Sequence, residues 1–444
     1  MLKEEKALSH RNDERDLGVL GTFSIGIGGI VGGGIFATLG LAGSEARGAT
    51  YLSFLVGGLV ALLTAYSYIH LTLAYPGKGG TVTFINRAFG TGIFAGGLNT
   101  LLVLSYVVVM ALYASAFGTY SASFVQGHSR HLWYQALTSG IIVVLALVNL
   151  LSPRLVDESE GVFNVGKLSI LVIFVVAGLA SAGITFQRLR PSDWVSPLDI
   201  VSSGMLVFLS YEGFELIANA SDRVRNPERT LPYAYYGSIV IAIVLYIFIV
   251  IVALGHLSFE ALARVQNFSL SAAAEAFMGR TGFVLLAIGA MLATASAINA
   301  DFFGASKLPI MLAEAGEAPK KYGREVWGRH PAGLVMIATF ALLVVNFVNL
   351  HAIAAASSAG FLLVFAMVSV GNARLSRETR SRTWVSIVAA LTCFAALGTM
   401  LVQIGRNPHH RQELIVIAAL TIIPFLYQLA YRSLRTGTYR SESN

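Results

Sequence analysis

Long apolar stretches alternate with short polar stretches along most of the chain. Each apolar stretch is close to the ~20 residues that an α-helix needs to cross the hydrocarbon core of a bilayer. The pattern predicts about twelve membrane-spanning helices, at 17–40, 51–75, 93–124, 133–152, 161–185, 198–220, 232–256, 282–306, 331–349, 352–373, 383–404 and 412–431. We therefore expect an all-α integral membrane protein.

Two connections between these spans have patterns of their own. Residues 257–280 mix apolar and polar positions, which predicts a short helix on the outer surface and a candidate lid. Residues 75–92 (YPGKGGTVTFINRAFGTG) are rich in glycine and only weakly polar. This second pattern predicts a loop packed against the cytoplasmic face.

Composition and charge support a membrane location. Only 12% of the 444 residues are charged, about half of the ~25% usual in soluble domains. If the N-terminus is cytoplasmic, 22 of the 31 lysines and arginines lie on that side and 8 on the outer side. The positive-inside rule then places both termini in the cytoplasm of a multi-pass cell-membrane protein. The net charge of +7 thus reflects topology in the lipid bilayer and does not indicate nucleic-acid binding.

The first span has an unusual density of glycine, GIGGIVGGGIF at 26–36. A dinucleotide-binding loop is excluded, because Val31 stands where the third glycine is needed and no strand precedes the motif. Glycine pairs spaced GxxxG favour close packing of two helices. Three consecutive glycines at 32–34 favour a break, which at membrane depth must line a cavity or be buried in protein. The N–H groups freed at the start of the next half-helix suit a carboxylate-bearing small substrate.

The sixth span contains a second interruption, where Gly213 lies between Glu212 and Glu215 in an otherwise apolar stretch. If five spans form a repeat unit, spans one and six are equivalent, and the second unit is inverted because five is odd. Interrupted helices at corresponding positions of two halves indicate a transporter binding site. The predicted organisation is a cytoplasmic tail (1–16), a first five-helix repeat (17–185), a second inverted repeat (198–373), two further helices (383–431) and a cytoplasmic tail (432–444).

Both interrupted segments resemble a known family. GIGGIVGGGIF is similar to the first-helix motif of the amino acid–polyamine–organocation (APC) superfamily, and FLSYEGFELIANASDRVRNPERTLP (208–232) is similar to its sixth-helix signature. Segments 102–120, 166–178 and 287–307 also resemble proton-coupled prokaryotic amino acid transporters of this superfamily. The resemblance implies a 5+5 inverted-repeat fold with helices 1 and 6 broken, helices 11–12 added, and an α-amino acid held between the breaks.

The resemblance also implies which residues contact the substrate. The carboxylate would meet N–H groups around the three consecutive glycines, and the ammonium would meet carbonyls freed in the sixth span. The predicted substrate contacts are Ile30, Gly32, Gly33, Gly34, Tyr106, Leu209, Ser210, Glu212 and Gly213. Tyr106 has packing as its alternative role. Glu212 is expected to face a cationic or polar side chain, to bind the transported proton, or to be satisfied by neighbouring backbone groups.

At two positions the sequence departs from the family pattern in a way that affects how the substrate is expected to be bound. Relatives often have Ser, Thr or Ala at the position of Gly33, and glycine supplies no hydroxyl there. Position 209 is Leu where some members carry an aromatic residue that closes over the substrate. Tyr211 or Phe214 would take that gating role, and Glu215 resembles an acidic residue near the cytoplasmic gate, with a structural pairing as the alternative.

Lys167 is the lysine placed well inside a span. It either snorkels to the cytoplasmic interface or takes the place of a sodium ion and alternates between charged and neutral forms, as the resemblance to proton-coupled relatives implies. Ser296 on span eight is its expected neighbour in proton coupling. Asp301, nearer the end of the same span, is expected to be solvated or paired.

These features favour a secondary active transporter that imports an α-amino acid by proton symport with alternating access. The alternative is an amino acid or polyamine exchanger of the same fold. No hydrolase, metalloprotease or nucleotide-binding motif is found in the sequence, so an enzyme is not expected. We expect the proton as coupling ion and no cofactor or metal. Monomer and homodimer fit the sequence equally well.

Overall fold

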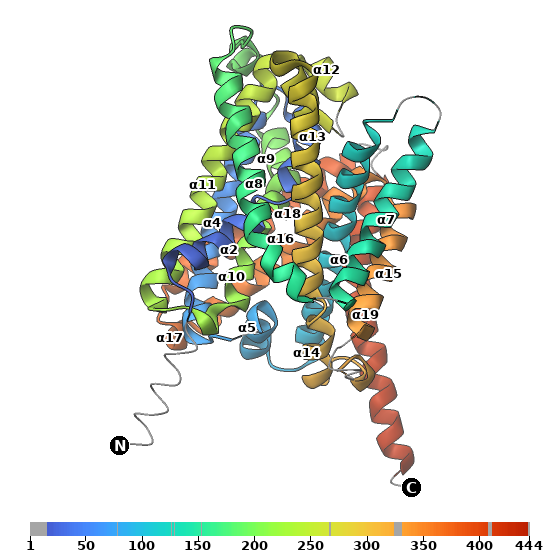
Figure 1. The fold of residues 1–444 in the computed structure, drawn as a ribbon. Coiled ribbons are helices and arrows are strands. Elements are labelled where there is room, and N and C mark those ends of the chain that lie inside the picture. Colours follow the sequence, from blue (N-terminus) through green and yellow to red (C-terminus); the bar gives the residue numbers. More distant parts are fainter. Residues whose placement is uncertain are drawn as a thin grey trace.

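The computed structural model describes residues 16–442, except 78, 126, 128, 152, 266–267, 324–330 and 407–410. This part of the chain is a helical bundle without a β-sheet (Figure 1). The long helices and the half-helices are α2 (Val19–Ile30), α3 (Gly34–Ala46), α4 (Thr50–Ala74), α6 (Ile93–Ala122), α7 (Arg130–Leu151), α8 (Pro153–Ala180), α9 (Pro197–Phe208), α10 (Leu216–Asn219), α11 (Pro227–His256), α13 (Ser269–Ala305), α15 (Pro331–Phe347), α16 (Leu350–Arg374), α18 (Thr383–Arg406) and α19 (Arg411–Glu442). The short elements are α5 (Gly80–Phe89), α12 (Phe259–Arg264), α14 (Leu308–Glu314), α17 (Ser376–Thr379) and the 3-10 segments η1 (Gln187–Leu189), η2 (Pro191–Asp193), η3 (Leu209–Glu215), η4 (Ser221–Arg223) and η6 (Lys320–Gly323).

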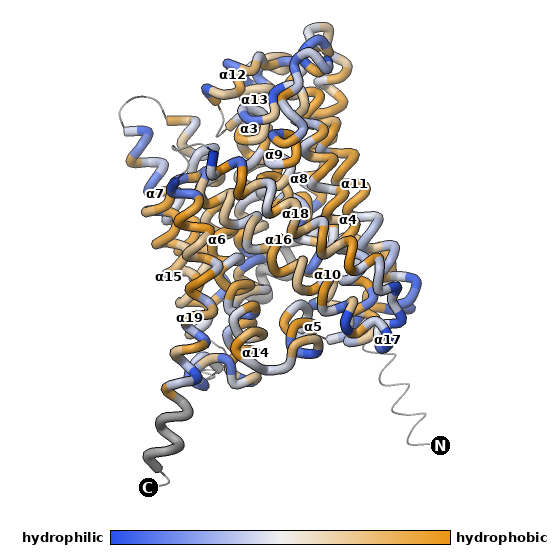
Figure 2. Tube along the Cα trace, turned by 180° about the vertical axis from the view of Figure 1, so that it is seen from behind, coloured by the Kyte–Doolittle hydropathy of each residue, from blue (hydrophilic) through white to orange (hydrophobic). Residues whose placement is uncertain are grey.

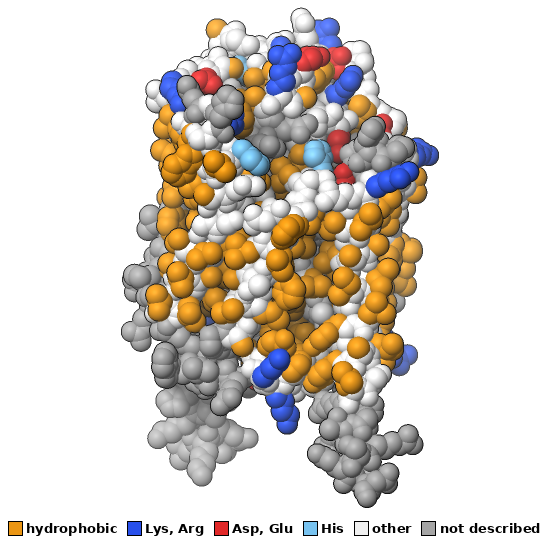
Figure 3. All heavy atoms as spheres, turned by 90° about the vertical axis from the view of Figure 1, so that its right-hand side faces the viewer, with side chains coloured by type: hydrophobic (Ala, Val, Ile, Leu, Met, Phe, Trp, Pro, Cys, Tyr) orange, Lys and Arg blue, Asp and Glu red, His pale blue; other side chains and the backbone are white. Residues whose placement is uncertain are grey.

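The spans expected from hydropathy are present as helices. Among the described residues, ten helices are long and apolar enough to cross a membrane, and the bent pair α2–α3 makes up to eleven. A shorter apolar helix at 332–347 lies where the ninth span is predicted, so the total of twelve stays a prediction. Figure 2 shows hydrophobic residues along the length of the bundle and hydrophilic residues toward its two ends. The space-filling view in Figure 3 shows the same apolar belt, with charged side chains above and below it.

The bundle has two distinct ends. We call the end where α2 begins and α19 ends the terminal side, and the other end the distal side (Figure 1). α5 follows the second span on the terminal side, whereas α12 follows the seventh span on the distal side. This placement of short helices at equivalent points of the two halves, on opposite ends, is what an inverted repeat predicts. The repeat itself stays a prediction.

Both connections with unusual sequence patterns contain a helix. The prediction of a loop at 75–92 is wrong for its central part, because Val82, Phe84 and Ile85 of α5 are buried and give this helix an apolar face. α12 presses the buried Leu262 against Gly43 near the distal end of α3. A side chain at Gly43 would meet Leu262, so α12 covers the distal half of the first span.

The core is centred on the helices that carry the interruption in the sixth span. Tyr68 on α4 packs edge-on against Phe214 of η3 and Phe365 of α16, with ring centroids 5.4 and 5.2 Å apart. Edge-to-face pairs of this kind add about 0.5–1.5 kcal/mol to the burial of the rings. The aromatic cluster therefore holds η3 firmly against α4 and α16, and it fixes where the residues of η3 point.

Candidate functional site

The first span is broken within the glycine-rich stretch. α2 ends at Ile30, α3 begins at Gly34, and the two half-helices are bent by 44°. Val31 leaves the helical region with ψ of 58°, while Gly33 keeps φ of −69°. None of the glycines in this stretch has a positive φ. Freedom to adopt left-handed backbone is therefore not the reason why glycine is used here.

These glycines are required by close neighbours instead. A Cβ at Gly29 would lie 2.6 Å from the carbonyl oxygen of Gly213, and one at Gly34 would lie 2.6 Å from Ser210 Cα. A Cβ at Gly33 would lie 2.6 Å from the Tyr113 ring. Close packing and a helix break, which stood as alternatives in the sequence, are thus both present. Because these residues have no side chain, α6 and η3 lie directly against the backbone at the break between α2 and α3.

The interruption in the sixth span has a different form from the one expected. Instead of an unwound turn, the backbone tightens into the seven-residue 3-10 segment η3, Leu209–Glu215, and then continues as α10. A 3-10 stretch within a helix replaces the i→i−4 bonds with i→i−3 bonds and frequently marks a hinge. The span remains continuous while its hydrogen-bond pattern changes beside the break in the first span.

Tyr246 on α11 joins the two interruptions, a role that the sequence-based expectations did not include. Its hydroxyl lies 2.7 Å from the carbonyl oxygen of Ile30 and 3.1 Å from that of Ser210. It is therefore the donor for carbonyls at the end of α2 and within η3. Tyr246 is fully buried. A tyrosine inside an apolar span needs such a partner for its hydroxyl, which is the signal that could have identified it.

Lys167 lies in the middle of α8 and is 1% exposed. Its ammonium donates a hydrogen bond of 2.7 Å to the carbonyl oxygen of Gly28, in the last turn of α2. The carbonyl end of a half-helix carries a partial negative charge, which a cation stabilises. The side chain is thus directed at the break in the first span and does not extend to the bundle surface, so this geometry does not fit the snorkelling alternative.

A narrow cavity lies between the interrupted spans and α13. About 10 Å³ of it is open to a water-sized sphere, on the order of the space that one water molecule needs. It is lined by Gly28, Gly29, Tyr113, Glu212, Gly213, Leu216, Ser296, Ala297, Ala300 and Asp301. We call it the central cavity. Because it is so small, a larger ligand can enter only if the surrounding helices separate.

The central cavity brings together some of the predicted site residues. Glu212, Gly213 and Ser296 line it, and Ser296 shares this lining with Gly28, the residue that Lys167 contacts. Asp301 also lines it and is 6% exposed. The expectation that Asp301 is solvated is therefore wrong, because it lines this narrow cavity inside the bundle instead of facing solvent.

Other predicted residues lie outside the lining of the central cavity. These are Ile30, Gly32, Gly33, Gly34, Tyr106, Leu209, Ser210, Tyr211, Phe214 and Glu215. The Ser210 hydroxyl pairs with that of Thr38 at 3.0 Å, and the Tyr211 hydroxyl donates to the carbonyl of Phe54 at 2.8 Å. Tyr211 is held in the core by this bond, as Phe214 is by the aromatic cluster, so neither ring covers the cavity in this conformation.

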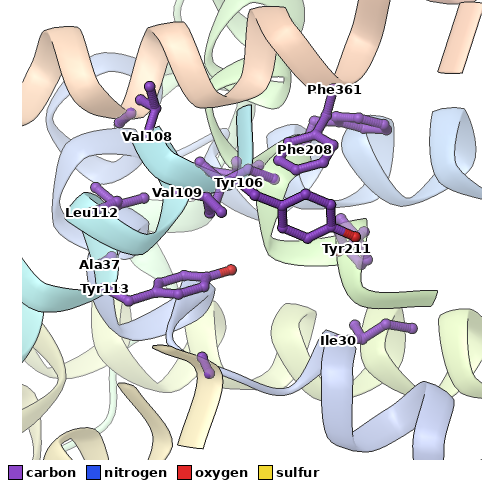
Figure 4. Packing of buried hydrophobic residues seen from close by; sticks show 14 of the residues in the cluster. Ile30, Ala37, Tyr106, Val108, Val109, Leu112, Tyr113, Phe208, Tyr211 and Phe361 are labelled. Atoms are coloured by element: carbon purple, nitrogen blue, oxygen red, sulfur yellow. The ribbon is translucent and has the colours of Figure 1, made fainter. Parts of the chain in front are cut away.

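Tyr113, which the sequence analysis missed, is the aromatic side chain that reaches the central cavity. It lies two turns along α6 from Tyr106. In Figure 4 its ring projects from α6 toward the end of α2, where Ile30 lies. The signal for it was weak, because an aromatic residue in an apolar span is usually core packing.

Glu215 is satisfied by three hydroxyl groups. It accepts hydrogen bonds from Tyr68 at 3.1 Å, from Thr81 at 3.4 Å, and from Tyr106. These donors come from α4, α5 and α6, so one buried carboxyl ties η3 to three other helices. This arrangement fits the structural pairing expected for Glu215, at the level where a terminal-side gate would lie.

A second cavity, of about 450 Å³, adjoins the central cavity toward the terminal side. The two share Leu216 and Ala300, and Tyr106 and Thr81 line the second one. We call it the vestibule. Its lining residues are Ile25, Gly79, Thr81, Leu102, Tyr106, Leu216, Asn219, Ala220, Arg223, Asn299, Ala300, Phe303, Gly304, Lys307, Leu308 and Met311. The central cavity therefore has a larger cavity next to it on the terminal side.

An ion pair lies at the mouth of the vestibule. Arg223 of η4 donates to both carboxylate oxygens of Asp16, at 3.0 and 2.5 Å. The guanidinium holds the pKa of the Asp16 carboxyl below its usual value. The backbone supports the same junction, since the Leu17 N–H donates to the Arg223 carbonyl at 3.0 Å. The start of α2 is thus fastened to the segment that follows the sixth span.

Comparison with known proteins places the chain among membrane permeases. The sequence profile of a family described as amino acid permease matches residues 17–425. The inner membrane transport protein YbaT of Escherichia coli is 33% identical over 387 residues, covering 86% of this chain and 88% of that protein. The protein MJ0609 of Methanocaldococcus jannaschii is 30% identical over 419 residues, covering 94% and 95%. The branched-chain amino acid permease BcaP of Bacillus subtilis is 24% identical over 379 residues, covering 80% of each chain.

Proposed function

The chain belongs to the amino acid permease family, and from this premise we propose that it imports an α-amino acid together with a proton by alternating access. Membership of this family makes the protein a membrane transporter of the APC superfamily rather than an enzyme. The coupling ion, the direction of transport and the orientation in the membrane belong to the proposal. Its orientation follows from the excess of lysine and arginine on the terminal side, which becomes the cytoplasmic side.

The observation that carries the proposal is the hydrogen bond from Lys167 to the Gly28 carbonyl. A protonated lysine supplies a positive charge at the carbonyl end of α2 without a bound sodium ion. Burial disfavours the charged form of a lysine, so loss of its proton to the cytoplasm would weaken this charge-assisted contact and loosen α2. Protonation would then be coupled to the position of the first span, which is what symport requires.

In this proposal the substrate lies between the two interruptions. Its carboxylate meets N–H groups at the start of α3, around Gly32–Gly34, and its ammonium meets the carbonyls of η3. The Tyr246 hydroxyl already donates to the carbonyls of Ile30 and Ser210, which supports the assignment of this region as one that accepts a hydrogen-bond donor. The vestibule is the exit path.

Uptake of a labelled amino acid mixture into proteoliposomes tests the proposal. We expect an inward proton gradient to drive accumulation by the wild type, and Lys167→Ala to lose the response to the gradient. Lys321→Ala is the control, because this lysine lies in η6 outside the spans. Uptake that ignores the gradient but requires amino acid inside the vesicles would replace symport by exchange, and Lys167 would then be a structural cation.

A further inference from the structure

Two acidic side chains from different helices face the central cavity. Glu212 comes from η3 and is 4% exposed, and Asp301 comes from α13 and is 6% exposed. The other residues of the lining are glycine, alanine, leucine, serine and tyrosine. No lysine, arginine or histidine is among the lining residues in the part of the chain that the structure describes.

The environment of this pair differs from that of Glu215. Three hydroxyl groups satisfy the Glu215 carboxyl, whereas Oδ2 of Asp301 is buried with no hydrogen-bond partner among the described residues. A buried carboxylate oxygen without a partner is strongly unfavourable. Such a group in the lining of a cavity indicates that a donor is supplied by the molecule that binds there.

The charges around the cavity show what kind of donor is required. Glu212 and Asp301 both line the cavity, with Glu215 close by on η3, whereas Lys167 is the cation that the described residues bring to its edge, at the Gly28 carbonyl. The head group of an α-amino acid is a zwitterion and adds no net charge. Carboxyl groups therefore outnumber cations around the cavity, and the neutral head group does not change this excess.

We propose that Glu212 and Asp301 form a subsite for a cationic side chain, so that the substrate is an α-amino acid with an ammonium or guanidinium group. This inference rests on the proposed function and deepens it. A cation between two carboxylates gains charge-assisted hydrogen bonds in a site that excludes water. Separation of the helices around Leu216 and Ala300, which the central cavity and the vestibule share, makes room for the side chain.

Charges elsewhere along the molecule agree with a cationic substrate. A cavity of about 410 Å³ near the distal ends of α3 and α18 is lined by three carboxyl residues, Glu45, Asp199 and Glu413, and one cation, Arg47. Among the described residues, the lining of the vestibule includes Lys307 and Arg223, the latter paired with Asp16, and no acidic residue. A cavity lined mainly by carboxyl groups on the distal side attracts cations, and basic residues in the vestibule do not retain them.

The test compares amino acids of equal shape and different charge. Wild-type protein in proteoliposomes is offered L-lysine against L-norleucine, and L-arginine against L-citrulline. We expect kcat/KM for the cationic member of each pair to be at least tenfold higher. If norleucine and citrulline are taken up as fast as lysine and arginine, or faster, the proposed cationic subsite is wrong, although amino acid transport itself is established. Absence of uptake of any amino acid would contradict the proposed function itself.

Isosteric variants test the two carboxyls directly. Glu212→Gln removes one of the two carboxyl groups of the subsite, so the preference for lysine over norleucine should fall at least tenfold, through faster uptake of norleucine as well as slower uptake of lysine. Asp301→Asn should act in the same direction. Glu228→Gln, an exposed carboxyl at the start of α11, is the matched control and should keep the wild-type preference.

A binding measurement covers the case in which a variant transports poorly. Thermal unfolding of the detergent-solubilised protein should show a larger stabilisation by L-lysine than by L-norleucine for the wild type, and a reversed order for Glu212→Gln. The same order in both proteins contradicts the subsite. The number of protons carried with norleucine gives a second way to contradict the subsite. If the wild type carries one more proton with norleucine than Glu212→Gln does, then Glu212 and Asp301 bind a proton and not a cationic side chain.

Discussion

Gly29 of α2 and Gly213 of η3 meet backbone to backbone where the two interrupted spans cross. A Cβ at Gly29 would lie 2.6 Å from the Gly213 carbonyl oxygen, and a Cβ at Gly213 would lie 2.2 Å from the Gly29 carbonyl carbon. Both obstacles are main-chain atoms, which cannot rotate aside as a side chain can. The separation of the first and sixth spans is therefore set by the absence of two side chains.

Replacement of either glycine by alanine should force the two spans apart. We expect Gly29→Ala and Gly213→Ala each to lower uptake more than tenfold, because the lining of the central cavity comes from both segments. Gly140→Ala is the control: this helical glycine has nothing within 4 Å of the added methyl, and alanine should favour the helix by about 1 kcal/mol. Normal uptake by Gly213→Ala would mean that the crossing is looser than the structure shows.

Tyr246→Phe tests the hydroxyl that joins the two interruptions. Loss of the donor leaves buried carbonyls of Ile30 and Ser210 less well satisfied, which should reduce the free energy of unfolding by about 1–2 kcal/mol and lower uptake. Thermal unfolding and proteoliposome uptake measure the two effects. Tyr235→Phe, on the same helix, removes a buried hydroxyl that pairs with Thr72. It should lose stability but keep the kinetics of transport, and equal transport defects in both variants would argue against a specific role for Tyr246.

The contact between Gly33 and Tyr113 should appear as energetic coupling. Gly33→Ser places a side chain 2.6 Å from the Tyr113 ring and 3.1 Å from Thr294 Cγ2, so it should destabilise the protein. Combining it with Tyr113→Leu should recover part of the loss, with a coupling energy of at least about 0.5 kcal/mol. Thermal unfolding of the double-mutant cycle measures this energy. The exposed Tyr233 supplies the reference cycle. In this cycle the effects of Gly33→Ser and Tyr233→Leu on the free energy of unfolding should be additive.

Glu317 predicts a pH dependence of stability. This carboxyl lies after α14, accepts a hydrogen bond of 2.8 Å from Asn99 of α6, and is buried, which raises its pKa above the usual value. A raised pKa means that the folded protein binds the proton more tightly than the unfolded chain does. Stability from this group is therefore present at low pH and is lost as the pH rises through the pKa of the folded state.

Glu317→Gln should remove this dependence. Oε1 of Glu317 and Oδ1 of Asn99 are both buried without a hydrogen-bond partner among the described residues, so an amide N–H in place of the carboxylate is favourable. We expect the variant to be more stable than the wild type at pH 8, by about 1 kcal/mol, and the difference to shrink toward pH 5. A constant difference across this range, measured by thermal unfolding, would assign the effect to something other than titration of Glu317.

Much of the architecture could be predicted because the cost of placing polar groups in a bilayer is a property of each segment. The positions of the spans and the interruption in the first span followed from hydropathy and glycine content. Lys167 was recognisable because a lysine inside an apolar span is costly unless it has a partner. The partner itself, the Gly28 carbonyl, is 139 positions away in the chain, and no local pattern connects the two.

Local patterns were less informative about the form of the interruptions and about the residues between them. The sixth span tightens into η3, whose Phe214 packs against Tyr68 and Phe365 from distant parts of the chain. Tyr246 and Tyr113 looked like ordinary core residues. Asp301 looked solvated because it lies near the end of a predicted span, and only its position in one cavity with Glu212 and Gly213 shows that it is buried.

The sequence by itself determined that this protein is a helical membrane protein of the amino acid permease type, with its charges sorted to one side and glycine concentrated at the first break. Whether a segment is apolar enough to enter the bilayer, and on which side its charges lie, depends mainly on that segment. These properties can therefore be predicted segment by segment along the sequence. The tertiary structure alone decided that Gly29 lies against Gly213, and that Glu212 and Asp301 share one cavity. Such pairings depend on the packing of segments far apart in the chain, and packing is a property of the whole fold.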